Sequence, residues 1–293
     1  GFNWDFSFNA SLVHNKIIKL PYNGNENNRQ GGTQVFDPKT QQVIWVGGYQ
    51  EGHTMGDIYA YKQVKILSDW NEVNTMAGNY IDMIAGLYGP NVSDADKKKY
   101  GLTKPIEPGD VLWADLDGNH KIDQLDRVKV GNIYPKWTGG FSTTLSYKNV
   151  SLYGRFDFAL GHTILNMVAM RSLGQSVGFK NIIKEGLKTW TEENTNTDLP
   201  KSYYDDSTNK KNIYRDTKGS DITSVNDRSS RFYEKGDYLA LRELTLNWKL
   251  PVNWISKVGM TNASVYITGQ NLFYITGYSG SCLLYTSPSP RDG

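Results

Sequence analysis

The segment of this sequence best suited to chemistry is an acidic stretch, Asp115–Asp126. Its oxygen-bearing side chains stand at positions 1, 3, 5, 9 and 12 of a twelve-residue window, and position 7 can contribute its backbone carbonyl. This is the order in which EF-hand loops supply oxygen ligands to calcium, a hard cation that takes six to eight of them. The predicted ligands are Asp115, Asp117, Asn119, Lys121, Asp123 and Asp126.

Two positions of this stretch depart from the EF-hand pattern. Position 6 is His120, where the sharp turn normally requires glycine, and position 12 is Asp126, which is shorter than the usual bidentate glutamate. A surface loop held together by Asx turns, without any metal, accounts for the same residues, so both interpretations stay open. Magnesium fits less well than calcium, because magnesium demands octahedral geometry and retains several waters.

No set of residues in the sequence is arranged for catalysis. The four histidines, His14, His53, His120 and His162, are scattered and form no metal-binding spacing. Nucleophile-elbow, P-loop and dinucleotide-binding motifs are absent, and a single cysteine, Cys282, excludes a multi-cysteine zinc site. A glycoside hydrolase would need two carboxylates in one cleft, and the pattern assigns none. We therefore predict that the protein is not an enzyme and requires no cofactor.

The composition favours a β-rich protein. Aromatic residues make up 13% of the 293 residues, including 19 Tyr and 8 Trp, while mean hydropathy is only −0.54. A membrane β-barrel reconciles these values, because it carries aromatic girdles and needs apolar residues on only one face of each strand. The net charge of +2 argues against nucleic-acid binding. No apolar run reaches the roughly 18 residues that a transmembrane helix needs.

Several segments alternate apolar and polar residues with the period of two that is typical of strands. The clearest are residues 3–12, 141–147, 150–160, 244–250 and 263–270. In Val150–Leu160 one face carries Val, Leu and Phe, while the other carries Arg155 and Asp157. We interpret these two charges as a structural ion pair on a water-facing side, with contact to a substrate as the alternative. Strands of about ten residues have the length of a tilted membrane strand.

The remaining sequence is polar and rich in turn formers. We predict outer loops over Asp69–Pro108 and Asn166–Ser230, and a short helix that follows the N-cap residue Ser93 in the first of them. A hairpin is expected over residues 33–46, and a link containing a short helix over Val252–Gly259.

Eight stretches, taken together and in order, resemble one known family. They are Glu51–Tyr61, Gly109–Asp123, Asp126–Asn132, Pro135–Tyr147, Arg155–His162, Trp190–Pro200, Tyr238–Pro251 and Ile267–Phe273. The series resembles the SusC/RagA-type TonB-dependent transporters of Bacteroidota outer membranes.

The resemblance implies an all-β fold: an antiparallel transmembrane β-barrel segment, part of a 22-stranded plugged barrel, with long outer loops that contain short helices. Residues 1–280 are then expected to be a partial barrel, with the plug, the first strands and the closing strand outside this chain. Residues 281–293 resemble a translated sequencing adapter, so we expect them to be a non-native tail.

The resemblance also implies a function. The parent protein would sit in the cell outer membrane as a multi-pass barrel, surrounded by lipid, and import oligosaccharides or other large nutrients such as peptides. Its implied partners are a SusD-like surface lipoprotein and TonB, the latter acting through the missing N-terminal region. The alternative is a soluble β-sandwich carbohydrate-binding module with a structural calcium loop. That alternative predicts strands of five to seven residues whose apolar faces pack on each other.

Overall fold

The computed structural model describes residues 1–173, 184–201 and 229–280. The chain divides into two compact units. The first, here called the sheet unit, comprises Gly1–Asn15, Asn132–Ile164 and Lys235–Ser279. The second, here called the loop unit, comprises Lys16–Gly131, Leu165–Glu234 and Gly280–Gly293. The expected non-native tail, residues 281–293, lies outside the described residues.

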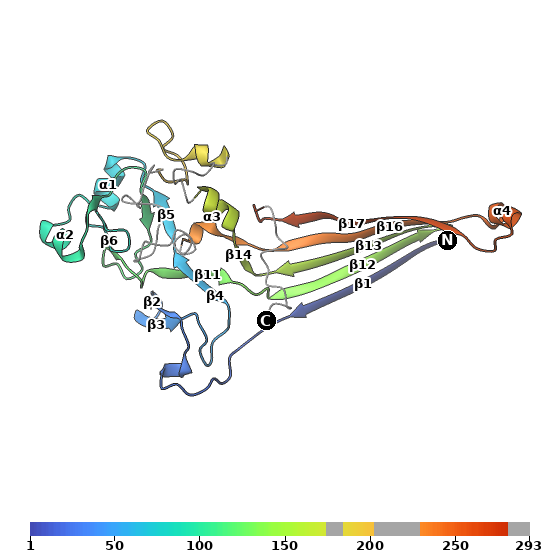
Figure 1. Cartoon of the computed structure of the whole chain (residues 1–293), viewed down its shortest axis with the longest axis horizontal. Coiled ribbons are helices and arrows are strands. Elements are labelled where there is room, and N and C mark those ends of the chain that lie inside the picture. The colour runs from blue at the N-terminus through green and yellow to red at the C-terminus, as the bar shows by residue number, and fades with distance from the viewer. Residues whose placement is uncertain (174–183, 202–228, 281–293) are drawn as a thin grey trace. The chain divides into compact units, whose positions relative to one another are not determined.

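The sheet unit is built on a five-stranded antiparallel sheet in the order β1-β12-β13-β16-β17 (Figure 1). The strands are β1 (Phe2–Leu12), β12 (Trp137–Tyr147), β13 (Val150–Leu160), β16 (Tyr238–Lys249) and β17 (Ser264–Thr276). They have 11 to 13 residues each, so the prediction of long alternating strands is confirmed.

The register of this sheet places like residues in rows across it. One row runs Trp4, Leu145, Leu152, Leu246 and Ile267, each paired with the next. The adjacent row runs Asp5, Thr144, Tyr153, Thr245 and Thr268. Because successive side chains of a strand point to opposite faces, the sheet has one apolar and one polar face.

The apolar face is exposed to its surroundings. Trp4 is 62% exposed, Phe6 57% and Ile267 72%. A β-sandwich would bury these side chains between two sheets roughly 10 Å apart. The expectation of the soluble alternative, short strands with mutually packed apolar faces, is therefore wrong for this sheet.

The register shifts at one level of the sheet. On β16, Arg242 has no partner on β13, because Arg155 pairs with Glu243 and Phe156 with Leu241. Between β16 and β17 the pairing shifts at the same place. Such β-bulges bend a strand and redirect a side chain.

The elements between β1 and β12 are mostly short. They are a 3-10 helix (Glu26–Asn28), β2 (Thr33–Asp37), β3 (Gln42–Val46), β4 (Asp57–Tyr61), β5 (Gln63–Ile66), α1 (Trp70–Met76), β6 (Ile81–Asp82), β7 (Leu87–Tyr88), α2 (Asp94–Tyr100), β8 (Lys104–Pro105), β9 (Val111–Trp113), β10 (Lys121–Ile122) and β11 (Arg127–Asn132). The strands β10, β6, β7 and β8 form a small mixed sheet, and the other pairs are β11 with β4, β2 with β3, and β5 with β9.

A hydrophobic core holds the loop unit together. Its buried members are Tyr61, Ile66, Leu67, Val73, Ala77, Tyr80, Leu87, Ile106, Val111, Leu112, Trp113, Ile122 and Trp190. Many of them lie in Asp69–Pro108, so this predicted outer loop is a packed structure. The described parts of Asn166–Ser230 include α3 (Met167–Leu173) and a 3-10 helix (Lys184–Lys188). The rest of that loop, residues 174–183 and 202–228, lies outside the described residues.

Several local predictions are confirmed. Helix α2 begins after Ser93, whose side chain accepts a hydrogen bond from the Asp96 N–H, and β2 and β3 form the expected hairpin. The link after β16 contains α4 (Val252–Ile255) and a 3-10 helix (Ser256–Val258). In the described residues, no helix is both long and apolar enough to cross a membrane.

Three short elements adjoin the sheet strands β13 and β16 in the chain. These are β14 (Thr163–Leu165), a 3-10 helix (Ser230–Phe232) and β15 (Tyr233–Lys235), with β14 paired to β15.

Candidate functional site

The acidic segment is anchored in the core of the loop unit just before its first residue and again at β10, in its second half. Trp113, which ends β9, is 3% exposed, and Ile122 in β10 is fully buried. Strand β10 runs parallel to β6, and the Ile81 N–H donates to the His120 carbonyl at 2.9 Å. The backbone of the loop is therefore positioned by the core, and the backbone in turn positions the carboxylates.

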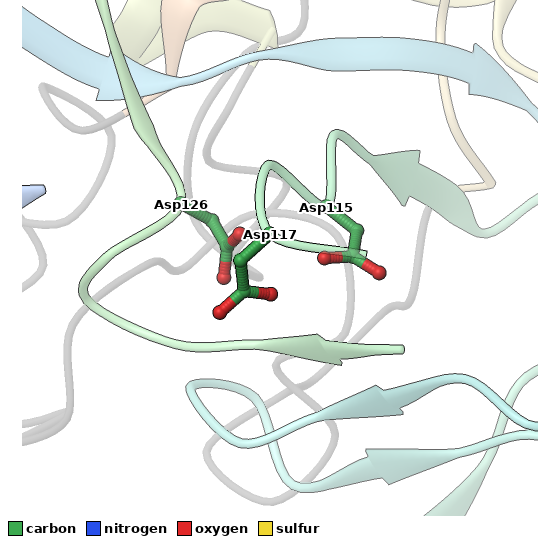
Figure 2. Close-up of side chains that lie close together, drawn as sticks. All are labelled: Asp115, Asp117 and Asp126. Atoms are coloured by element: carbon green, nitrogen blue, oxygen red, sulfur yellow. The ribbon is translucent and has the colours of Figure 1, made fainter. Parts of the chain in front are cut away.

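Three of the predicted ligands are brought together. Carboxylate oxygens of Asp115, Asp117 and Asp126 all lie within 4.8 Å of one another. Figure 2 shows Asp115 and Asp117 coming from the first half of the loop and Asp126 from its end. The loop thus brings together three carboxylates whose grouping the sequence spacing predicted, although ten residues lie between the first and the last.

Two other predicted ligands, Asn119 and Asp123, accept hydrogen bonds from the backbone of the loop. The Asn119 side-chain oxygen accepts from the Lys121 N–H at 2.7 Å, and an Asp123 oxygen accepts from the Leu125 N–H at 2.7 Å. These are the Asx turns of the metal-free interpretation. Asp123 does not belong to the group of three carboxylates.

The clustered carboxylates also accept backbone hydrogen bonds. Asp115 accepts from the N–H groups of Gly118 and His120, both bonds being under 3 Å. Asp126 accepts from the N–H groups of Leu116 and Asp123 at 2.8 Å each. One hydrogen bond per oxygen leaves lone pairs free for a cation, because a carboxylate offers about four acceptor sites.

His120 takes up the backbone conformation that its position requires. Its φ is +61°, in the left-handed region that favours glycine. His120 therefore adopts the conformation that glycine usually provides at this position of the loop. Histidine is among the residues that enter this region more readily than β-branched ones do.

The electrostatics of the cluster disfavour charge. Burial, together with the nearby carboxylates of Asp123 and Asp115, raises the pKa of Asp126 to about 6, against the opposing effect of its backbone hydrogen bonds. Burial and the carboxylate of Asp115 also raise the pKa of Asp117. A hard cation among these groups would offset their mutual repulsion, and the donor set consists of oxygens only. The residues present therefore fit a calcium-like ion.

A second cluster lies on the polar face of the sheet. Arg242 forms a bidentate pair with the Asp157 carboxylate, through Nε and through Nη2 at 3.0 Å, and also donates to the Tyr274 hydroxyl. The Tyr238 hydroxyl donates to the same carboxylate at 3.2 Å. The bulge in β16 directs Arg242 into this position.

The predicted Arg155–Asp157 ion pair is wrong. Asp157 pairs with Arg242 on the next strand, and the nearest Arg155–Glu243 nitrogen–oxygen distance is 3.7 Å. Residues i and i+2 of a strand are roughly 6.6 Å apart along it, whereas directly paired cross-strand residues are closer. The signal for Arg242 was present in the sequence: the apolar positions of β16 shift from Leu239 and Leu241 to Leu244 and Leu246, which marks an inserted residue.

An open groove of about 440 Å³ runs over this part of the sheet. Its polar lining includes Ser7, Asn9, Ser142, Arg155, Asp157 and Arg242. Hydroxyl, amide and guanidinium groups of this kind form hydrogen bonds with water or with polar solutes.

Comparison with known proteins identifies relatives over most of the chain, although no protein-family model matches it. TonB-dependent receptor P3 of Formosa agariphila is 29% identical over 280 residues, which is 96% of this chain and 23% of that protein. TonB-dependent receptor P26 of the same organism is 25% identical over 272 residues, covering 92% of the chain and 22% of that protein. The chain thus spans about a quarter of the length of the curated relatives that it matches.

Solved structures give the same result for the fold. The superposition with the RagAB peptide transporter covers 95% of this chain and 24% of the transporter chain, with a TM-score of 0.56 and 20% sequence identity. The RagAB peptide importer in the closed-closed state gives a TM-score of 0.54 and 21% identity. In sequence the chain is therefore related to the TonB-dependent receptors and in fold to the RagAB transporter, which confirms the predicted resemblance to the SusC/RagA type.

Proposed function

We propose that this chain forms part of the wall of an outer-membrane transporter barrel, and that the parent protein imports large nutrients. The observation that carries the proposal is the two-faced sheet, whose apolar face continues across five strands of 11 to 13 residues. A transmembrane strand tilted by about 45° needs about 9–11 residues. An exposed apolar face of this extent is rare on water-soluble proteins and suits contact with lipid.

The polar face would line the interior of the barrel. Arg155, Asp157 and Arg242 stand in the middle of their strands, where charged groups need water or one another. Ion pairing and the hydroxyls of Tyr238 and Tyr274 provide such an environment. We propose that the complete barrel has 22 strands and encloses a plug, in keeping with the resemblance.

The substrate and partners are further parts of this proposal. We infer that the parent imports oligosaccharides or peptides, of which peptides are named for the RagAB transporter. A SusD-like lipoprotein would act at the outer mouth, and TonB would act through a region outside this chain. The relatives are named as receptors and transporters, which supports the expectation that the parent is not an enzyme.

Membrane partition of the parent protein tests the barrel. We expect the full-length parent to sediment with outer membranes and to remain there after washing with carbonate or urea. Detergent should be required to release it, because the apolar face needs an apolar environment. Recovery of the folded parent in the soluble fraction without detergent would show that it is not a membrane barrel.

We also propose that the acidic loop binds a calcium ion through Asp115, Asp117 and Asp126, and that this ion stabilises the loop unit. The gathering of these three carboxylates supports the proposal. Calorimetric titration of the refolded parent with calcium, beside the variant Asp115→Ala/Asp117→Ala, tests it. Heat of binding should appear for the unaltered protein and be lost in the variant; equal traces would remove the metal from the proposal.

A further inference from the structure

Several large apolar side chains are exposed in the link between β16 and β17. Val252, Trp254, Val258 and Met260 are each more than half exposed there, within a link of 14 residues, Leu250–Ala263. The side chain of Ile255 is buried, which anchors the link, whereas those four apolar side chains remain exposed.

This link continues the apolar face of the sheet. The last apolar row at this end consists of Phe2, Tyr147, Val150, Trp248 and Val265, each paired with the next. Trp254 packs edge-on against Trp248, with ring centroids 6.0 Å apart. The exposed apolar side chains therefore belong to a surface that the proposed function already places in lipid.

An open groove of about 500 Å³ lies in the same surface. Its apolar lining is Phe2, Leu145, Tyr147, Val150, Leu152 and Trp248. The hairpin turn Lys148–Asn149 also borders it. A groove with an apolar floor and a cation at its border suits a molecule with a hydrocarbon chain and an anionic head.

The charge at this end has one sign. Lys148, Lys249 and Lys257 are exposed, and neither residues 147–151 nor residues 247–266 contain an Asp or Glu. The Lys148 ammonium lies 5.4 Å from the centre of the Tyr147 ring, so its charge stays next to the aromatic row. Lysines near the ends of membrane segments extend their charge to the headgroups while their stems stay against apolar surface.

We propose that this end of the sheet, the row from Phe2 to Val265 together with the link Leu250–Ala263, is a phospholipid-binding interface. Acyl chains of the adjoining leaflet lie in the groove and against Val252, Trp254 and Val258, and the three lysines contact the lipid phosphates. The inference rests on the proposed membrane location of the sheet and adds a membrane contact made by a connecting link. It also assigns the leaflet, because short turns of outer-membrane barrels face the periplasm, where the leaflet is phospholipid.

Nitroxide accessibility in the parent protein tests the link separately from the sheet. Single labels at Leu152→Cys in the sheet, Val258→Cys in the link and Lys98→Cys in the loop unit are compared in vesicles of phosphatidylethanolamine and phosphatidylglycerol. We expect the labels at 152 and 258 to collide with oxygen, which concentrates in lipid, and the label at 98 to collide with a water-soluble nickel chelate.

The outcomes separate the two proposals. If the label at 152 reports lipid while the label at 258 reports water, the interface is wrong and the barrel stands. If both report water, the barrel itself fails and the interface with it.

A matched pair of triple variants tests the lysines. In Lys148→Gln/Lys249→Gln/Lys257→Gln we expect retention of phosphatidylglycerol by the detergent-purified parent to fall about fivefold for each lysine removed. The control is Lys97→Gln/Lys98→Gln/Lys99→Gln in α2, which removes the same charge from the loop unit. Equal retention in both triples, whether lowered or unchanged, would overturn the assignment of phosphates to these lysines.

Discussion

Asp126 combines a structural role with a charge that is costly to bury. Its carboxylate holds the loop through the Leu116 and Asp123 N–H groups, yet burial and neighbouring carboxylates raise its pKa to about 6. Because this pKa is raised, protonation of Asp126 stabilises the folded, cation-free loop. The stabilisation is complete below pH 3.8, the ordinary pKa of the group, and is lost as the pH rises through about 6. A bound cation favours the deprotonated carboxylate instead, because the carboxylate must lose its proton to act as a ligand.

Calcium affinity is therefore expected to depend on pH. At pH 5 only about a tenth of Asp126 is deprotonated, so the apparent affinity should be roughly tenfold lower than at pH 7. Calorimetric titrations at pH 5, 6 and 7 measure this directly. The variant Asp126→Asn should bind more weakly and with a flatter pH profile. Equal affinity of the unaltered protein at pH 5 and pH 7 would contradict the assignment of Asp126 as a ligand.

At the scale of single residues, the sequence predicted which side chains of a short loop come together better than it predicted ion-pair partners on different strands. The order of oxygen-bearing residues was enough to place Asp115, Asp117 and Asp126 together, because the ligand pattern of a short loop is local. The partner of Asp157 was not predictable in this way, since Arg242 is 85 positions away and reaches it only through strand pairing and a bulge.

At the scale of the strand, the proposed barrel predicts that the effect of a charge depends on its depth in the bilayer. Phe156 lies near the centre of β13 on the apolar face, stacked on Phe141 at 4.5 Å, and Val150 lies on the same face at the end of the strand. Phe156→Arg is expected to destabilise the inserted parent by about 2–4 kcal/mol, and Val150→Arg by about 0–1 kcal/mol. Urea unfolding from vesicles measures both variants. Similar costs at the two positions would mean that β13 does not cross the bilayer.

Strands and helices were predictable from the sequence where a single strong hydrophobic pattern runs along the element. Alternation located the long strands because one face is uniformly apolar over 11 residues. Helix α1 was not predicted, although Asp69 caps it by accepting from the Glu72 N–H, because only Val73 of its residues is buried and no helical stripe shows. The extended stretch from Asp57 to Ile66 is divided into β4 and β5. This division is set by pairing, since β4 pairs with β11 and β5 with β9.

At the scale of the whole molecule, the edges of the sheet determine what the chain can do alone. Strands β1 and β17 stand at the two edges and have 11 and 13 residues. In hydrocarbon, the unpaired N–H and C=O groups of such edges cost several kcal/mol each, so an open sheet cannot remain inserted. We therefore predict that residues 1–280, refolded alone into vesicles, give no protease-protected species and no transport.

The same reasoning predicts a rescue. Co-refolding residues 1–280 with the separately produced remainder of the parent should restore a protected complex, because the strands that the proposed barrel places beside β1 and β17 become available for pairing. The full-length parent is the positive control. Protection of residues 1–280 without the remainder would show that this sheet satisfies its own edges, and the proposal that it is a section of a larger barrel would fail.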